Sequence, residues 1–216
     1  MKPGRLITLE GGDGAGKSSQ INPIRDFLSA RDIPVIVTRT PGGTPLAEAI
    51  RSLILDHTPE SPEPLTELLL AFAALRQHWV RVIEPALDSG TWVLCDRFVD
   101  SAYPYQGAGR GIPINQIETL ENWVLGSRRP DLTFFFETPV EIALPRAKTS
   151  DHANRMEQAS ITWHELVHQG YFSRIKAEPN RFIVVYGQGG VTRTPDEIIH
   201  HLEHRLKEWT NGETPK

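Results

Sequence analysis

The sequence predicts an α/β fold in which a parallel sheet of about five strands lies between two layers of helices. Three observations support this prediction. Short β-like runs alternate with longer helical patterns along the chain, which favours parallel strands joined by helical crossovers. Several of the short runs are almost continuously apolar, as in strands that are covered on both faces. The chain has 216 residues, no internal repeat and no linker, so we expect residues 1–216 to form one domain.

The individual elements follow from these runs. In chain order, the strands are expected at Arg5–Leu9, Pro34–Thr38, Trp92–Cys95, Leu132–Glu137 and Phe182–Tyr186. Helices are expected at about Lys17–Arg31, Leu46–Asp56, Leu65–Ser89, Ile114–Leu125, Val140–Ala147, Glu157–Glu178 and Asp196–Trp209. The segment His57–Pro64 contains three prolines and is typical of a loop, and Asn211–Lys216 is expected to be a frayed tail.

Composition excludes several classes of protein. The formal charge is −4, with 23 basic and 27 acidic residues, so there is no basic excess for a nucleic-acid or membrane-surface partner. The single cysteine cannot form an internal disulfide, and the first residues lack the apolar segment of a secretory signal. No segment has the run of about 18 apolar residues that a membrane helix needs. We therefore expect a cytoplasmic protein.

The strongest motif is GGDGAGKSS, which follows the first predicted strand and fits the phosphate-loop pattern G-x-x-x-x-G-K-[ST]. Its glycines allow backbone N–H groups to turn toward a phosphate, and the helix that follows presents its positive end. The residues expected to bind ATP are Gly11, Gly12, Asp13, Gly14, Ala15, Gly16, Lys17, Ser18 and Ser19. Lys17 is expected to hold phosphate and Ser18 to bind Mg²⁺. The alternative, a glycine-rich turn with a chance lysine, does not explain why strand, loop and helix occur in this order.

A second motif, Asp96-Arg97, ends the third predicted strand. In a parallel sheet, the carboxyl ends of the strands gather at one edge, so this pair is expected beside the phosphate loop. There, Asp96 would bind Mg²⁺ and Arg97 would bind a phosphate through two hydrogen bonds. An Asp-Arg pair by itself is more often a surface ion pair.

The residues after Asp96 make this interpretation more specific. The run DRFVDSAYPYQG at Asp96–Gly107 and the run TRTPGGT at Thr38–Thr44 resemble the thymidylate kinases of bacteria, which are P-loop nucleoside monophosphate kinases. The resemblance continues in LAEAIRSLIL (Leu46–Leu55), FAALRQ (Phe72–Gln77), AGRGI (Ala108–Ile112), RRPDLTFFFE (Arg128–Glu137) and RMEQ (Arg155–Gln158). It implies a P-loop NTPase fold with a short mobile lid at about residues 145–156. It also implies a homodimer, and the transfer of the γ-phosphate of ATP to dTMP with Mg²⁺.

The resemblance assigns roles in binding dTMP. Asp13 matches an acidic residue that accepts a hydrogen bond from the sugar 3′-hydroxyl, although an aspartate can also stabilise a turn. Phe72 matches the residue that stacks on thymine, and Arg76 one that binds a base carbonyl. The i, i+4 spacing places both on one helix face. Without the resemblance, Phe72 would be interpreted as core packing and Arg76 as a solvated charge.

Further residues match positions around the phosphate and sugar of dTMP. The cations expected at the dTMP phosphate are Arg39, Arg51 and Arg97, which suits a monophosphate that must approach a triphosphate. Tyr105 matches a residue that favours deoxyribose, and Gln106 a polar residue at the base edge. Ser101 is a further candidate, but a serine at the start of a helix is often an N-cap.

The sequence departs from the family at three positions that bear on catalysis. Thr40 stands where relatives have a glutamate, and Gly14 where one subgroup has a catalytic arginine. Basic residues of the lid are therefore expected to act instead, but Ser150 occupies a position where an arginine is common. The expected catalytic residues are Lys17, Arg97, Lys148 and Arg155.

The expected function is ATP-dependent phosphorylation of dTMP. Two alternatives remain open, a nucleotide-binding relative with weakened or lost catalysis and a kinase for another monophosphate. A P-loop GTPase is disfavoured because the sequence has no N-K-x-D motif.

Overall fold

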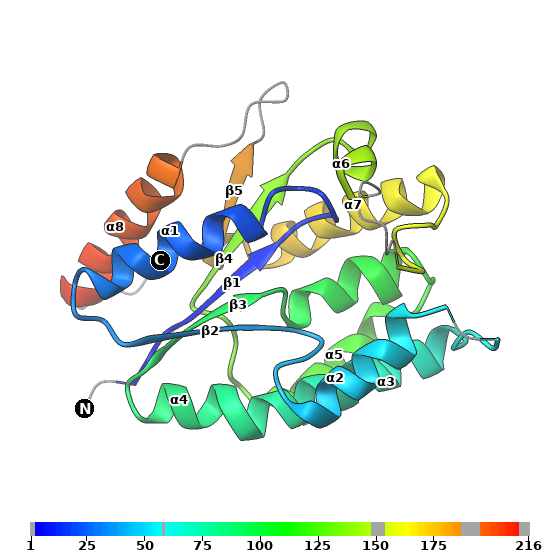
Figure 1. Cartoon of the computed structure of the whole chain (residues 1–216), viewed down its shortest axis with the longest axis horizontal. Coiled ribbons are helices and arrows are strands. Elements are labelled where there is room, and N and C mark those ends of the chain that lie inside the picture. The colour runs from blue at the N-terminus through cyan, green and yellow to red at the C-terminus, as the bar shows by residue number, and fades with distance from the viewer. Residues whose placement is uncertain (1–2, 58, 148–153, 187–194, 212–216) are drawn as a thin grey trace.

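The computed structural model describes residues 3–57, 59–147, 154–186 and 195–211. It confirms the predicted fold: five parallel strands form one sheet in the order β2-β3-β1-β4-β5 (Figure 1). The strands are β1 (Leu6–Glu10), β2 (Val35–Arg39), β3 (Trp92–Asp96), β4 (Leu132–Glu137) and β5 (Phe182–Tyr186). Each lies within one residue of its predicted position.

Helices cover both faces of the sheet (Figure 1). They are α1 (Ser18–Ser29), α2 (Pro45–Leu55), α3 (Pro64–His78), α4 (Glu84–Asp88), α5 (Ile114–Leu125), α6 (Val140–Ala147), α7 (Ile161–Ala177) and α8 (Pro195–Asn211). Short 3₁₀ turns occupy Val99–Ser101 and Pro179–Arg181. The described part of the chain contains no helix with the length and apolar character that a membrane crossing requires.

Alternate side chains of the central strands pack into different cores. Ile7 and Leu9 of β1 pack with α1 and α8, whereas Leu6 packs with α3 and α5. Phe135 of β4 lies in a third core with Tyr171 of α7. This alternation explains why the strands read as continuous apolar runs: both faces are buried.

One predicted helix is interrupted. The sequence pattern predicted a single helix over Leu65–Ser89, but α3 ends at His78, and a π-helical turn at Trp79–Ile83 joins it to α4. The N–H of Glu84 bonds to the carbonyl of Trp79, five residues earlier. Pro85 explains the wider turn, because its ring has no N–H and would collide with the carbonyl four residues before it in a regular helix. A second π-helical turn occupies Tyr103–Ala108 and contains Pro104.

Buried ion pairs fix the segment that follows β3. Asp100 is fully buried, and its carboxylate accepts hydrogen bonds from Arg174 Nε at 2.8 Å and from both terminal nitrogens of Arg181 at 2.6 and 2.7 Å. These arginines lower the pKa of Asp100, although burial alone would raise it. The contacts join the end of α7 and the start of β5 to the segment after Asp96.

We expect Asp100→Asn to lower the free energy of unfolding by about 3–5 kcal/mol, because it removes the charge of the fully buried carboxylate that Arg174 and Arg181 share. The matched variant Asp26→Asn removes the partner of Arg25 in an exposed pair and should cost about 0–1 kcal/mol. Urea denaturation of both variants measures the difference. Equal losses would show that the buried cluster does not stabilise the fold.

Candidate active site

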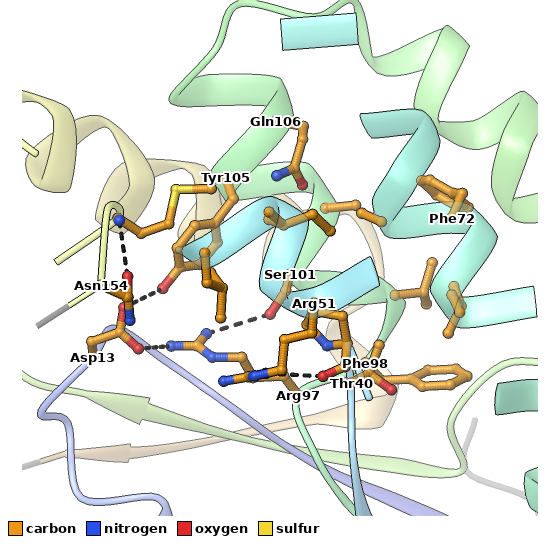
Figure 2. A pocket seen from close by; sticks show the side chains of 18 residues that line it. Asp13, Thr40, Arg51, Phe72, Arg97, Phe98, Ser101, Tyr105, Gln106 and Asn154 are labelled. Atoms are coloured by element: carbon orange, nitrogen blue, oxygen red, sulfur yellow. Dashed lines mark hydrogen bonds and ion pairs between the residues drawn. The ribbon is translucent and has the colours of Figure 1, made fainter. Parts of the chain in front are cut away.

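The candidate site lies at the carboxyl edge of the sheet. The ends of β1, β2 and β3 are neighbours there, since Leu9 is in register with Asp96 on one side and Arg39 with Asp96 on the other. Two adjoining pockets open at this edge. One contains the phosphate loop, and we call it the phosphate pocket; the other, the acceptor pocket, is shown in Figure 2. Asp13, Thr40, Arg51 and Arg97 line both pockets.

The phosphate loop has the conformation that its glycines predict. Gly11, Gly14 and Gly16 all have positive φ angles, which side-chain-bearing residues rarely adopt. At Gly14, a Cβ atom would lie 2.0 Å from the carbonyl oxygen of Ala143 in α6. The packing of α6 on the loop therefore excludes the arginine that one family subgroup has at this position.

Lys17 is buried under the loop. Its Nζ donates to the carbonyl oxygens of Gly11 at 3.0 Å and Gly12 at 2.8 Å. Burial and the neighbouring Arg97 cation lower the pKa of Lys17 to about 8, and the carboxylates of Asp13 and Asp96 oppose this shift. The ammonium group lies in the phosphate pocket, where a phosphate oxygen could replace the two carbonyls.

The two predicted metal ligands, Ser18 and Asp96, line the same pocket. Asp96 Oδ1 is buried without a hydrogen-bond partner among the described residues, which is costly unless a ligand pairs with it. The described residues contain no cluster of three or more His, Cys, Asp or Glu side chains able to hold a metal ion. One carboxylate and one hydroxyl suit Mg²⁺ that is bound together with phosphates, because this ion usually takes few protein ligands.

Arg97 links the two pockets. Its guanidinium donates to Asp13 Oδ1 at 2.6 Å (Figure 2). It also donates to the hydroxyl of Tyr171 at 2.9 Å and lies over the ring of Tyr105, 5.0 Å from its centroid. Arg97 has a φ angle of 61°, which is uncommon outside glycine and typical of strained functional positions. Arg97 and Lys17 keep the pKa of Asp13 low, although burial acts in the opposite direction.

Glu10, the last residue of β1, was not predicted. It is fully buried, and its carboxylate accepts hydrogen bonds from the backbone N–H of Phe98 at 2.8 Å, Ser101 Oγ at 2.6 Å and the Tyr171 hydroxyl at 2.9 Å. Burial and the charge of Asp100 raise the pKa of Glu10 to about 7, against the effect of Arg97. The rule that pointed to Asp96, a polar residue at the carboxyl end of a strand, applies equally to Glu10.

The acceptor pocket contains most of the residues predicted to bind dTMP. Phe72, Ser101, Tyr105 and Gln106 all line it. Tyr105 OH donates to Asp13 Oδ2 at 3.4 Å. Ser101 does not cap a helix; its hydroxyl is bonded to Glu10 and receives a weak bond from Arg97 at 3.4 Å. Its position favours the ligand-binding interpretation over the N-cap alternative.

Arg76 does not reach this pocket. Its side chain is directed to α5, where Nη1 donates to the carbonyl oxygen of Val124 at 2.7 Å. Leu75, one residue earlier on α3, lines the pocket together with Phe72. On a helix, residue i lies on the same face as both residue i+3 and residue i+4. Counted from Phe72, it is the i+3 residue, Leu75, that lines the pocket here. The expectation that Arg76 binds a base carbonyl is therefore not met.

The cations Arg39 and Arg51 both lie at the phosphate pocket. Arg39 pairs with Glu48 at 2.9 Å, and Arg51 Nη1 donates to the carbonyl oxygen of Pro41 at 2.9 Å. These partners hold the arginines in the absence of the glutamate that the resemblance led us to expect at Thr40.

The predicted lid cations divide into two cases. Lys148 lies outside the described residues. Arg155 is described, but its guanidinium donates to the carbonyl oxygen of Ile54 at 2.9 Å and pairs with the buried Glu67 at 2.6 Å. Arg155 lines neither pocket. In this structure, it supports the wall of the acceptor pocket and does not act as a free cation at the phosphates.

Thr40 lies beside a buried histidine. The ring of His78 lies between two hydroxyls, with Thr38 Oγ1 2.7 Å from Nε2 and Thr40 Oγ1 3.2 Å from Nδ1. His78 has no exposed surface, and burial lowers its pKa to about 4. The ring is therefore neutral near pH 7, with one nitrogen donating and the other accepting.

The chain is similar to known proteins over nearly its whole length. The family model described as thymidylate kinase matches residues 9–198. The thymidylate kinase of Marinomonas sp. (strain MWYL1) is 43% identical over 206 residues, which cover 95% of this chain and 97% of that protein. The thymidylate kinase of Pseudomonas fluorescens is 47% identical over 207 residues, 94% of this chain and 99% of the relative. The crystal structure of thymidylate kinase from Ehrlichia chaffeensis has a TM-score of 0.74 and 30% identity, and the match covers 95% of this chain and all of that one.

The buried His78 predicts a loss of stability in acid. The unfolded chain takes up a proton below about pH 6.5, whereas the folded chain does so only near pH 4, so stability falls as the pH decreases between these values. Relative to His78→Gln, we expect wild type to lose about 1–2 kcal/mol between pH 7.5 and pH 5. Urea denaturation at both pH values measures this. The control His204→Gln removes an exposed ring, and parallel curves for wild type and His78→Gln would contradict the prediction.

Proposed function

Because the chain belongs to the thymidylate kinase family, we propose that it transfers the γ-phosphoryl group of ATP to dTMP and forms dTDP and ADP. The observation that carries this proposal is the pair of adjoining pockets. One contains the phosphate loop, the other is lined by aromatic and apolar side chains, and the two share Asp13, Thr40, Arg51 and Arg97. Two nucleotides bound in these pockets would meet with their phosphates at the shared residues.

The chemistry requires positioning and charge neutralisation. An oxygen of the dTMP phosphate attacks the γ-phosphorus of ATP, and the bond from that phosphorus to the β–γ bridging oxygen breaks. The attacking oxygen is already anionic, so no general base is needed. Lys17 would hold the β- and γ-phosphates, and Arg97 would hold the acceptor phosphate while Asp13 receives the sugar hydroxyl. The other predicted contacts are Arg39 and Arg51 with the phosphate, Phe72 with the base face and Tyr105 with the sugar.

The proposal includes Mg²⁺ held by Ser18 and Asp96. When bound, this ion would neutralise negative charge that develops on the phosphates during transfer. The buried and unpartnered Oδ1 of Asp96 supports this assignment. Lys148 is proposed as the lid cation that assists transfer, since Arg155 is engaged by Glu67.

A coupled assay of ADP formation tests the proposed reaction. Wild type should turn over with dTMP, and faster than with dUMP, dGMP or AMP. Lys17→Ala should lower kcat/KM for dTMP by at least about a hundredfold, because it removes the cation at the transferred phosphate. The control Arg128→Ala removes an exposed cation that pairs with Asp88 at the end of α4 and should leave turnover unchanged.

Two results would contradict the proposal. Tight binding of dTMP by calorimetry without any phosphate transfer would favour the alternative, a nucleotide-binding relative that has lost catalysis. Faster turnover with another monophosphate would favour a different acceptor. Melting temperatures of each variant separate loss of catalysis from loss of folding.

We further propose that the protein is a cytoplasmic homodimer. Support for the dimer comes from large apolar side chains exposed on adjacent helices: Leu46 and Leu53 on α2, Leu65 and Leu69 on α3, and Trp123 on α5, which is 80% exposed. Covering these side chains with a second copy would remove apolar surface from water. The single thiol, Cys95, is buried and unpaired, which suits a reducing compartment.

The dimer proposal predicts that Leu53→Glu shifts the sedimentation coefficient from that of a dimer to that of a monomer, because a charge would be buried at the contact. The control Leu166→Glu changes an exposed leucine on α7 and should leave the dimer intact. A wild-type monomer at micromolar concentration would exclude the proposed assembly.

A further inference from the structure

Glu67 is a fully buried carboxylate in the wall of the acceptor pocket, behind Gln106. It lies in the first turn of α3, and its two oxygens accept hydrogen bonds from three side chains. Oε1 accepts hydrogen bonds from Gln106 Nε2 at 3.0 Å and from Arg110 Nε at 3.2 Å. Oε2 accepts hydrogen bonds from Arg110 Nη2 at 3.1 Å and from Arg155 Nη2 at 2.6 Å. Two arginines thus compensate the charge of one carboxylate inside the fold.

This arrangement determines which end of the Gln106 amide faces the carboxylate. An ionised carboxylate only accepts hydrogen bonds, whereas the two ends of an amide differ: the nitrogen donates and the oxygen accepts. Glu67 therefore selects the nitrogen end. The oxygen of Gln106 must lie on the other side of the amide. Figure 2 shows Gln106 at the edge of the pocket, with the amide oxygen on the side of Phe72.

The rest of this end of the pocket is mainly apolar. Phe72, Leu75, Ala102 and Met156 line the same pocket as Gln106. The charged groups Asp13 and Arg97 lie on the opposite side, as Figure 2 shows. Arg76, which was expected to bind the base, donates to Val124 on α5 instead. The polarity of the Gln106 amide therefore has a large influence on which base can bind.

We propose that Glu67, held by Arg110 and Arg155, is a positioning residue that fixes the Gln106 amide with its oxygen toward the base and thereby selects bases with a ring N–H. The inference rests on the proposed function, in which this pocket holds the base of the acceptor. Thymine and uracil carry a hydrogen on N3 and can donate to an amide oxygen. Cytosine has an unprotonated N3, which would face that oxygen as a second acceptor, and this repulsion disfavours dCMP.

The inference also gives Arg155 a different role from the predicted one. Its guanidinium donates to the carbonyl oxygen of Ile54 at the end of α2 and to Glu67 on α3. Met156, the next residue, lines the acceptor pocket. Arg155 thus acts on the base through Glu67 and Gln106, at the wall of the pocket and away from the phosphates.

The test is the ratio of kcat/KM for dTMP to kcat/KM for dCMP in wild type and in Glu67→Gln. The amide that this substitution introduces has both a donor and an acceptor, so the Gln106 amide could turn over. We expect the ratio to fall about tenfold, the equivalent of about 1.4 kcal/mol, with the change in KM and not in kcat. Where turnover of dCMP is slow, its inhibition constant against dTMP replaces kcat/KM. Both substrates are measured on the same preparation, so partial unfolding cancels in the ratio.

Two further variants keep the test decisive. Gln106→Leu removes the acceptor and should lower the ratio by itself, and adding Glu67→Gln to it should cause no further change. The control Glu118→Gln, at an exposed site on α5, should leave the ratio unchanged. An unchanged ratio in Glu67→Gln or in Gln106→Leu would overturn the inference. It would also be overturned if Glu67→Gln lowered the ratio by the same factor in wild type and in the Gln106→Leu variant. Absence of dTMP turnover in wild type would instead overturn the proposed function.

Discussion

The ion pair between Arg97 and Asp13 joins the two halves of the candidate site. Asp13 belongs to the loop after β1 and Arg97 to the segment after β3, and their side chains meet at 2.6 Å with little exposure to solvent. The left-handed backbone at Arg97 is unfavourable for a residue with a side chain. This conformation persists because the backbone N–H of Arg97 donates to the carbonyl oxygen of Leu9. In addition, the N–H of the next residue, Phe98, donates to the carboxylate of Glu10. Neighbouring strands thus set the separation of the two pockets.

Several charges share this edge of the sheet, and their mutual compensation determines their protonation. The negative charge of Asp100 raises the pKa of Glu10, and the positive charge of Arg97 opposes this shift. Arg97 lowers the pKa of Lys17, and the carboxylates of Asp13 and Asp96 oppose that shift. Removing one member leaves another buried charge unpaired, which costs more than the pair contributes in an intact protein. The site is therefore held together by a network, in which the effects of single substitutions will not be additive.

Sequence patterns predicted the strands within one residue and the place of the phosphate loop between β1 and α1, because both depend on local features: period, glycine conformation and the order of strand, loop and helix. They failed where the outcome depends on packing between distant segments. The face of α3 that lines the pocket contains Leu75 and not Arg76, which the i, i+4 rule could not decide. Glu67 resembles any polar residue near the start of a helix, and only the fold brings Arg110 and Arg155 to it. The π-helical turn before Pro85 has a local cause, the missing N–H of that proline, which the apolar pattern over Leu65–Ser89 did not reveal.

Thr40 shows how a departure from the family pattern is accommodated. The Thr40 hydroxyl lies 3.2 Å from Nδ1 of His78, whose ring is kept neutral by burial. A carboxylate close to that ring would favour the charged imidazole instead. A hydroxyl avoids this conflict, since it can donate to or accept from a neutral ring. Arg39 and Arg51 then take their orientation from Glu48 and from the carbonyl of Pro41. The phosphate pocket therefore keeps its cations and loses one negative charge, which favours the close approach of two anionic phosphates.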